Sequence, residues 1–252
     1  MKPFAKRSKG LRVLAAVGGL AIAAGLALTV DALRGDPLSR AWAERRAIAR
    51  AEKLCPGQSF TVLDSWGGTF FNYGVTVQAA DSPDTTFHVT TSFWLLTEDD
   101  AANQLENRSR TLARQGAEGA QAIEAVLDEA CPQYERAAVY NAYASGELAS
   151  IELDLCWTPE APGAGAGECA GLFTPDAPFE ASVTAKVPDR LCAQILWDGA
   201  PENADFEAVA DAFDAALTAA GYDIDYYDLT LVPQNASHDA IQAMDIERIV
   251  AG

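Results

Sequence analysis

Residues 69–96 read TFFNYGVTVQAADSPDTTFHVTTSFWLL and contain two runs in which apolar and polar side chains alternate. The first run is residues 69–79 and the second is residues 86–96, with the letters DSPD between them. A period of two indicates a strand that buries one face, and Asp, Ser and Pro are typical turn residues. The stretch therefore predicts two adjacent strands of an antiparallel sheet.

The flanking residues extend this sheet and place helices beside it. Residues 60–66 predict a third strand, joined to the first run by a Gly-Gly hairpin turn. Residues 37–54 predict an amphipathic helix, and residues 97–130 predict a second helix that opens on the acidic letters TEDD. Both helices end at a Cys-Pro pair, because proline cannot continue a helix. We expect Gly116 and Gly119 to bend or interrupt the second helix.

The second half of the chain predicts further strands, one helix and a last strand. A loop rich in Gly, Pro and Ala at residues 158–168 divides this half. The expected fold class is therefore α+β, with antiparallel sheets packed against helices. The expected strands lie at residues 134–144, 147–157, 178–187, 191–197 and 223–232, and the helix at 203–220.

The N-terminus predicts a membrane attachment. Residues 13–30 carry no charge and follow a cluster of five Lys and Arg. As a helix they would span roughly 27 Å, close to the thickness of a bilayer core of about 30 Å. The basic cluster favours a cytoplasmic N-terminus, so we expect a single transmembrane signal-anchor helix and an extracytoplasmic body. A cleaved signal peptide and a secreted protein are the alternative.

These patterns predict three segments. Residues 1–36 would be the basic tip and the transmembrane helix. Residues 37–133 would hold the juxtamembrane helix, the three-stranded meander and the long helix. Residues 134–252 would form a second α+β half.

The charge of the chain is divided unevenly. Residues 1–54 contain eleven Lys and Arg against four Asp and Glu, a balance of +7, and residues 55–252 contain seven against thirty-two, a balance of −25. Nucleic-acid binding requires a basic surface, so this function class is excluded for the body. The acidity favours solubility and attracts cations or basic partners.

The five cysteines suggest disulfides, which an exported location would permit. Cys156 and Cys169 flank the loop at 158–168 and are the first expected pair. Cys55 and Cys131 are the second expected pair, and Cys192 is left over. No Cys or His spacing suits zinc, and no phosphate-binding loop or nucleophile motif occurs, so we expect no metal and no cofactor.

Few residues are candidates for a site. Arg110 and Arg114 lie four apart on one helix face, where like charges require an anion or acidic partners. An anion contact is one interpretation, and salt bridges to the abundant acids are the other. His88 falls on the polar side of its strand, and a general base there would need a nucleophile that the sequence does not supply. His238 lies near the C-terminus.

Three aspartates near the C-terminus invite a calcium interpretation. Asp223, Asp225 and Asp228 supply oxygen ligands of the kind that Ca²⁺ prefers. They lack the glycine and the distal glutamate of an EF-hand, and they alternate with Ile224 and a tyrosine. Outward-facing strand positions also explain the pattern, and we favour this interpretation over a calcium site.

Several features together resemble the YfjL-like group of uncharacterised, membrane-anchored proteins of Gram-positive bacteria. They are the basic start with one apolar segment, the helix that ends at Cys55-Pro56, the strand letters FNY and DTTFHV, and the acidic helix start. The resemblance covers mainly residues 10–130. It implies a membrane-anchored protein, and it brings no known activity and no catalytic residues.

We therefore expect a membrane-anchored extracytoplasmic protein that binds or interacts without catalysis. One alternative is a hydrolase of cell-envelope polymers that uses paired acidic residues. Another is an accessory subunit of a membrane complex. The ligand or protein partner is not specified by any motif.

Overall fold

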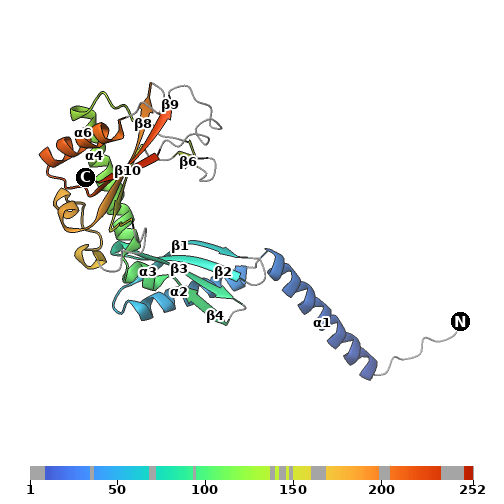
Figure 1. Cartoon of the computed structure of the whole chain (residues 1–252). Helices are drawn as coiled ribbons and strands as arrows, with labels where there is room; N and C mark the ends of the chain where they lie inside the picture. The colour runs from blue at the N-terminus through green and yellow to red at the C-terminus, as the bar shows by residue number, and fades with distance from the viewer. Residues whose placement is uncertain are drawn as a thin grey trace. The chain divides into compact units, whose positions relative to one another are not determined.

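The structure is a computed structural model of the chain (Figure 1). The chain forms two compact units, residues 1–102 (unit 1) and residues 103–252 (unit 2). The α+β part of the expected fold is confirmed, because helices pack on a sheet in each unit. The structure describes residues 9–34, 37–67, 72–92, 95–136, 140–141, 146–147, 150–159, 169–198, 205–233 and 247–251.

Unit 1 contains a four-stranded antiparallel meander with strand order β1-β2-β3-β4. The helix α2 packs against the first three strands (Figure 1). The elements are α1 (Lys9–Arg34), α2 (Pro37–Leu54), β1 (Phe60–Gly67), β2 (Asn72–Ala79), β3 (Ser82–Ser92) and β4 (Leu96–Asp99).

The alternation in the sequence sets which face of this sheet is buried. Val75 and Val77 of β2 are almost fully buried, and they face α2 because period-two residues share one side of a sheet. The helix contributes Ala43, Ala47 and Ala51, which are four residues apart and fully buried. Because alanine is small, the axis of α2 can lie close to the strands.

Residues 97–99 form the end of β4 rather than the start of a helix. Arg46 donates a hydrogen bond to the Thr97 hydroxyl at 3.1 Å, and Arg50 pairs with the Asp99 carboxylate at 2.8 Å. These contacts with α2, together with pairing to β3, override the helix-start chemistry of the acidic letters. The helix α3 (Ala101–Leu105) begins immediately afterwards.

The predicted membrane-spanning segment is corrected by the structure. The segment at residues 13–30 lies in α1, yet no helix among the described residues is both long enough and apolar enough to cross a membrane. The expected transmembrane helix and the single-pass membrane placement are therefore wrong. That expectation depended on the absence of charge, whereas nine of the eighteen residues are Ala or Gly, whose side chains add little apolar surface. Secretion after signal cleavage stays a prediction.

Unit 2 contains a four-stranded mixed sheet with strand order β10-β9-β8-β7. The pairs at both edges are antiparallel, but the central pair, β8 and β9, runs parallel. The helix α6 lies between these two strands in the chain, as a parallel crossover requires. The elements are α4 (Ser109–Ala130), β7 (Ile151–Leu155), β8 (Asp189–Trp197), α6 (Phe206–Ala219), β9 (Tyr226–Pro233) and β10 (Glu247–Ala251), with the short pieces β5 (Tyr140–Asn141), β6 (Gly146–Glu147), η1 (Ala170–Leu172) and η2 (Ala181–Lys186).

The core of unit 2 lies between the sheet and the helices α4 and α6 (Figure 1). In β8 every second residue from Asp189 to Ile195 is buried. The Asp205 side chain caps α6 by accepting a hydrogen bond from the backbone of Ala208 at 3.0 Å. Large buried core residues are Ile123, Leu127, Leu191, Ile195, Phe213 and Leu217.

Gly116 and Gly119 do not interrupt α4, which is continuous from Ser109 to Ala130. They are the points where the helix approaches β7. A Cβ atom at Gly119 would lie 2.6 Å from Leu153 Cδ2, and a Cβ at Gly116 would overlap the Leu153 carbonyl oxygen. The predicted segment 37–133 grouped this helix with the first sheet, whereas the helix packs on β7 in unit 2.

Replacing Gly116 with alanine should destabilise unit 2. Alanine favours a helix by up to about 1 kcal/mol over glycine, but overlap with a backbone oxygen typically costs about 1–3 kcal/mol, so we expect a net loss. Native-state hydrogen exchange of the β8 amides measures the unfolding free energy of unit 2 separately. Gly171→Ala is the matched control, because its Cβ would meet nothing within 4 Å. Equal exchange in both variants would contradict the close approach.

Candidate functional site

A groove of about 610 Å³ lies between α4 and β7. The α4 side is lined by small residues, including Ala113, Gly116 and Ala117, and the opposite side by residues 150–154. Small side chains on the helix leave the space open beside the strand. We call this space the edge groove, because β7 is the last strand of its sheet.

The backbone of β7 is paired on one side only in the part of the chain that the structure describes. The Ser150 carbonyl accepts a hydrogen bond from the Gln194 amide at 3.0 Å. In an antiparallel ladder, alternate residues exchange hydrogen bonds with the partner strand, so the backbone groups of Ile151 and Leu153 face away from β8. The edge groove therefore runs along unpaired backbone groups.

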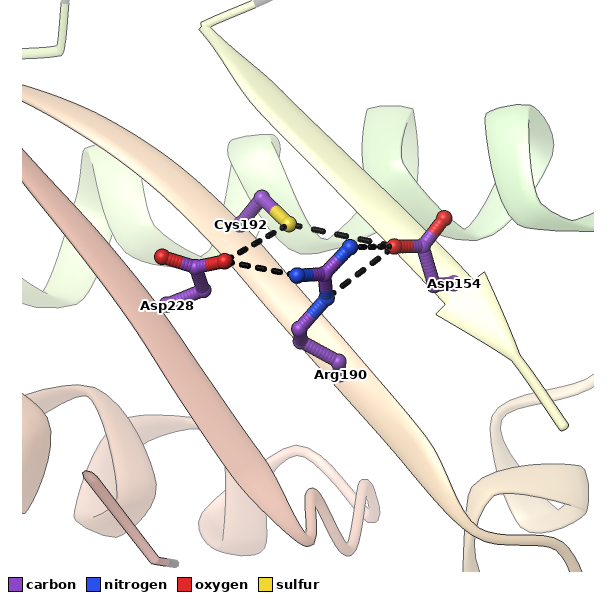
Figure 2. Close-up of polar contacts among 4 residues, drawn as sticks. All are labelled: Asp154, Arg190, Cys192 and Asp228. Carbon is purple, nitrogen blue, oxygen red and sulfur yellow. Dashed lines mark hydrogen bonds and ion pairs between the residues drawn. The ribbon is translucent and has the colours of Figure 1, made fainter. Parts of the chain in front are cut away.

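One end of the edge groove meets a charged cluster on the sheet. Figure 2 shows the Arg190 guanidinium between the carboxylates of Asp154 and Asp228. The Arg190 Nε and Nη2 atoms donate to Asp154 Oδ2 at 3.1 and 2.6 Å, and Nη1 donates to Asp228 Oδ2 at 2.7 Å. The guanidinium carbon also lies 4.4 Å from the centre of the Trp157 ring, a cation–π contact.

The strand register builds this cluster. Asp154 of β7 lies directly opposite Arg190 of β8, and Tyr226 of β9 lies on the other side. Asp228 is two residues further along β9 and so points to the same face. Three strands that are distant in sequence each supply one charged side chain.

Burial controls the electrostatics of the cluster. Burial raises the pKa of Asp228, while Arg190 lowers it. The Cys192 thiol lies 3.9 Å from a carboxylate oxygen of both Asp154 and Asp228, and burial raises its pKa to about 12. Cys192 is therefore protonated at neutral pH and is not an activated nucleophile.

The cluster keeps one uncompensated negative charge, and its more exposed carboxylate belongs to Asp154, which is one of the residues lining the edge groove. The side chain of Asp228 is 8% exposed and that of Asp154 is 41% exposed. The contacts of Asp154 with Arg190 and Cys192 use Oδ2, and its second carboxylate oxygen points away from the guanidinium (Figure 2). Glu124 and Glu152 line the same groove. The edge groove is therefore acidic.

Removing the guanidinium should destabilise unit 2. Arg190→Met leaves Asp228 buried without a counter-ion, which typically costs about 3–5 kcal/mol. The loss should shrink as the pH falls, because a protonated Asp228 needs no partner. Hydrogen exchange of the β9 amides at several pH values measures both effects. Adding Asp228→Asn should restore much of the stability, and the exposed Arg110→Met serves as the control; if Arg190→Met behaves like that control, the cluster does not stabilise the sheet.

Asp189 is a buried carboxyl group that the sequence reasoning missed. It is fully buried, its Oδ1 accepts a hydrogen bond from the Asp225 amide at 3.0 Å, and its Oδ2 has no hydrogen-bond partner among the residues that the structure describes. Burial raises its pKa to about 8, the Asp225 amide opposes this, and the nearby carboxylates of Asp223 and Asp225 raise it further. The sequence did contain a signal for it: Asp189 is two residues from Leu191, so both side chains point to the same, buried face of the strand.

Asp189→Asn should stabilise the protein at neutral and basic pH. Its pKa is near 3.8 in the unfolded chain and about 8 in the folded one, so the wild type loses stability as the pH rises between these values. Asparagine keeps the acceptor and removes this loss, which is on the order of a few kcal/mol at pH 8. Thermal melts at pH 4 and pH 8 check it, with exposed Asp211→Asn as control. A stability difference that does not change with pH would oppose a buried neutral carboxyl.

The other candidate site residues, beginning with Arg110 and Arg114, do not come together with the Arg190 cluster. Arg114 donates to Glu118 at 2.6 Å and to the Ala177 carbonyl at 2.8 Å, whereas Arg110 is exposed. The pair lies on one helix, but Arg114 is engaged within the fold. The anion contact of Arg110 and Arg114 stays a prediction.

The cysteines and the aspartates are also placed. Cys156 and Cys169 form a disulfide. The three thiols of Cys55, Cys131 and Cys192 are free. Asp223 and Asp225 are exposed, while Asp228 is bound by Arg190, so the three aspartates do not converge. Within the described ranges no group of three or more His, Cys, Asp or Glu could hold a metal ion.

Of the two histidines, only His88 lies in the part of the chain that the structure describes. His88 lies on β3, and its Nδ1 is 3.4 Å from the Thr76 hydroxyl. At 3.4 Å this contact is at the limit of hydrogen-bond distance, so it gives no evidence of an activated hydroxyl. His238 lies outside the described residues.

Comparison with protein-family models, with curated proteins and with solved structures finds no match to this chain. The resemblance to the YfjL-like group therefore stays a prediction. What the fold and the geometry define is a two-unit α+β protein with an acidic groove at a sheet edge.

Proposed function

We propose that this protein is a non-catalytic interaction module, and that unit 2 binds an extended, basic polypeptide segment in the edge groove. The observation that supports this most directly is the groove of about 610 Å³ that runs beside the edge strand β7. The proposal has three parts, which concern the backbone, the shape and the charge of the groove.

The backbone of β7 can accept another strand. Ile151 directs its backbone groups away from β8, and an incoming extended segment can pair with such groups. Main-chain pairing of this kind provides affinity without requiring a particular sequence. Gly116 approaches the Leu153 carbonyl, so pairing is freest toward Ile151.

The shape of the groove suits side chains of the incoming segment. Ala113 and Ala117 are exposed on α4 and line the groove. In an added strand every second side chain would point toward this helix. Small residues on the helix leave room for aliphatic side chains there.

The charge of the groove selects a basic segment. Glu124, Glu152 and Asp154 line it, and the chain carries a formal charge of −18. Complementary charge speeds association and rejects acidic partners. A Lys or Arg in the segment would meet the exposed oxygen of Asp154.

The hydrolase alternative receives no comparable support. Paired acids for hydrolysis need one protonated and one ionised carboxyl group facing a substrate. Asp154 and Asp228 are held apart by the guanidinium of Arg190 (Figure 2). Asp154 and Asp228 therefore serve as ion-pair partners of Arg190 in the sheet, and they do not face a common substrate position.

Binding can be tested with a peptide of three Lys-Val repeats, blocked at both ends, added to the ¹⁵N-labelled full-length protein. Six extended residues span about 20 Å, enough to follow β7. We expect saturable shifts of the Ile151 and Leu153 amide signals that weaken with salt. A peptide of three Glu-Val repeats, and a Lys-Val peptide with alternate amides methylated, should bind at least about tenfold more weakly.

Filling the groove provides the matched variant. Ala117→Phe places a ring in the edge groove, while Ala122→Phe places the same ring on an exposed α4 position that does not line it. We expect about tenfold weaker binding in the first variant and none of this loss in the second. Binding that is indifferent to Ala117→Phe, or equal for the acidic peptide, would refute the proposal.

A further inference from the structure

We infer that unit 1 carries a separate recognition site, where Trp66 on the open face of the β1–β4 sheet receives the guanidinium group of an arginine in a basic partner. This site involves none of the residues of the edge groove and does not depend on the function proposed for it. The face in question is the one opposite α2.

The strand registers place Trp66 on that open face. Trp66 lies opposite Gly74, whereas the preceding residue, Ser65, lies opposite buried Val75 and donates to Glu44 of α2 at 2.6 Å. Successive residues of a strand point to opposite sides. Trp66 therefore points away from the core of unit 1.

The missing side chain of Gly74 lets the indole extend across β2. A Cβ atom at Gly74 would lie 2.5 Å from Trp66 Nε1 and 2.6 Å from Cζ2. The indole thus covers the backbone of β2, and the Trp66 residue is still 50% exposed. One side of the indole packs on the backbone of β2, and the rest of the side chain is accessible to solvent.

His88 steadies the indole from β3. The two rings are 6.2 Å apart between centroids and inclined by 14°. The His88 ring in turn lies near Thr76, with Nδ1 at 3.4 Å from the hydroxyl. We call Trp66, Gly74, Thr76 and His88 the Trp66 platform. A ring held in this way loses little freedom when a ligand binds.

Two carboxylates share the open face with the platform, one on β1 and one on β4. Asp64 of β1 lies opposite Thr76, and Glu98 of β4 lies opposite Thr90 in the same cross-strand row as Trp66 and Gly74. Both acids are exposed, and both share the open face with Trp66. Because this face is the one opposite α2, the helix does not cover them.

No positive side chain on these strands competes for the carboxylates. The four strands β1 to β4 contain no Lys or Arg. The nearby Arg50 of α2 is paired with Asp99 on the covered side of the sheet. The open face is therefore negative, and it carries the accessible indole of Trp66.

A guanidinium group fits these features better than other ligands. It is planar and stacks on aromatic faces, and it forms paired hydrogen bonds with carboxylates. Attraction to an indole face adds to the attraction by the two acids on the same face of the sheet. A sugar could stack on the same ring but would gain nothing from the net negative charge of Asp64 and Glu98.

The test follows the Trp66 Nε1–H signal in ¹⁵N-labelled full-length protein, assigned by its absence in Trp66→Phe. The probe is acetyl-Gly-Arg-Gly amide, and the matched probe replaces arginine with citrulline, a neutral compound of the same shape. We expect the arginine probe to bind about threefold or more tightly, with shifts of Trp66 and His88 that decrease with salt.

Variants separate the site from a general charge effect. Asp64→Asn combined with Glu98→Gln should weaken binding of the arginine probe about threefold or more, whereas Glu52→Gln, an exposed acid on α2, should not. Equal binding of the citrulline probe would overturn the inference. So would stronger shifts with methyl β-glucoside, which would assign the platform to a sugar.

Discussion

The close approach of α4 to the edge strand β7 is the contact on which the rest of unit 2 depends. Gly116 and Gly119 remove the side chains that would separate the helix from Leu153. The same helix then reaches the segment around Ala177, where Arg114 and Gln115 donate to its carbonyl at 2.8 and 3.0 Å. Because the helix wall facing β7 is made of small residues, the contact also leaves the edge groove open. The packing of α4 on β7 therefore shapes both the core of unit 2 and the edge groove.

Local periodicity predicts much of this fold, and non-local contacts account for most of what it misses. The alternation around Val75 identified β2, because a strand that buries one face has alternating apolar and polar residues next to each other in the sequence. Residues 97–100 have helix-start chemistry, but Arg50 and β3 hold Asp99 in a strand. The parallel pairing of β8 and β9 has no local signature. The Arg190 cluster was equally hidden, since its three charged residues come from strands whose register is set by the whole sheet.

The two candidate sites use the acidity of the chain in different ways. Within unit 2, Arg190 pairs with the buried Asp228 and with the more exposed Asp154, which is one of the residues lining the edge groove. Within unit 1, the acids beside Trp66 lie on strands without any basic residue. A negative surface alone attracts every cation loosely. An accessible strand edge or an accessible indole adds the short-range contacts that make such attraction selective.

The order of the strands also affects how the chain reaches this structure. In unit 1 each strand pairs with its neighbour in sequence, so the loops that must close are short. In unit 2 the helix α6 lies between β8 and β9 in the sequence, and a long segment lies between β7 and β8, so both strand pairs join residues that are distant in the chain. Folding slows as contacting residues become more distant in sequence. Unit 1 is also synthesised first, so we expect it to fold before the strands of unit 2 have paired. In unit 2 the Cys156–Cys169 disulfide reduces the conformational freedom of the unfolded segment between β7 and β8.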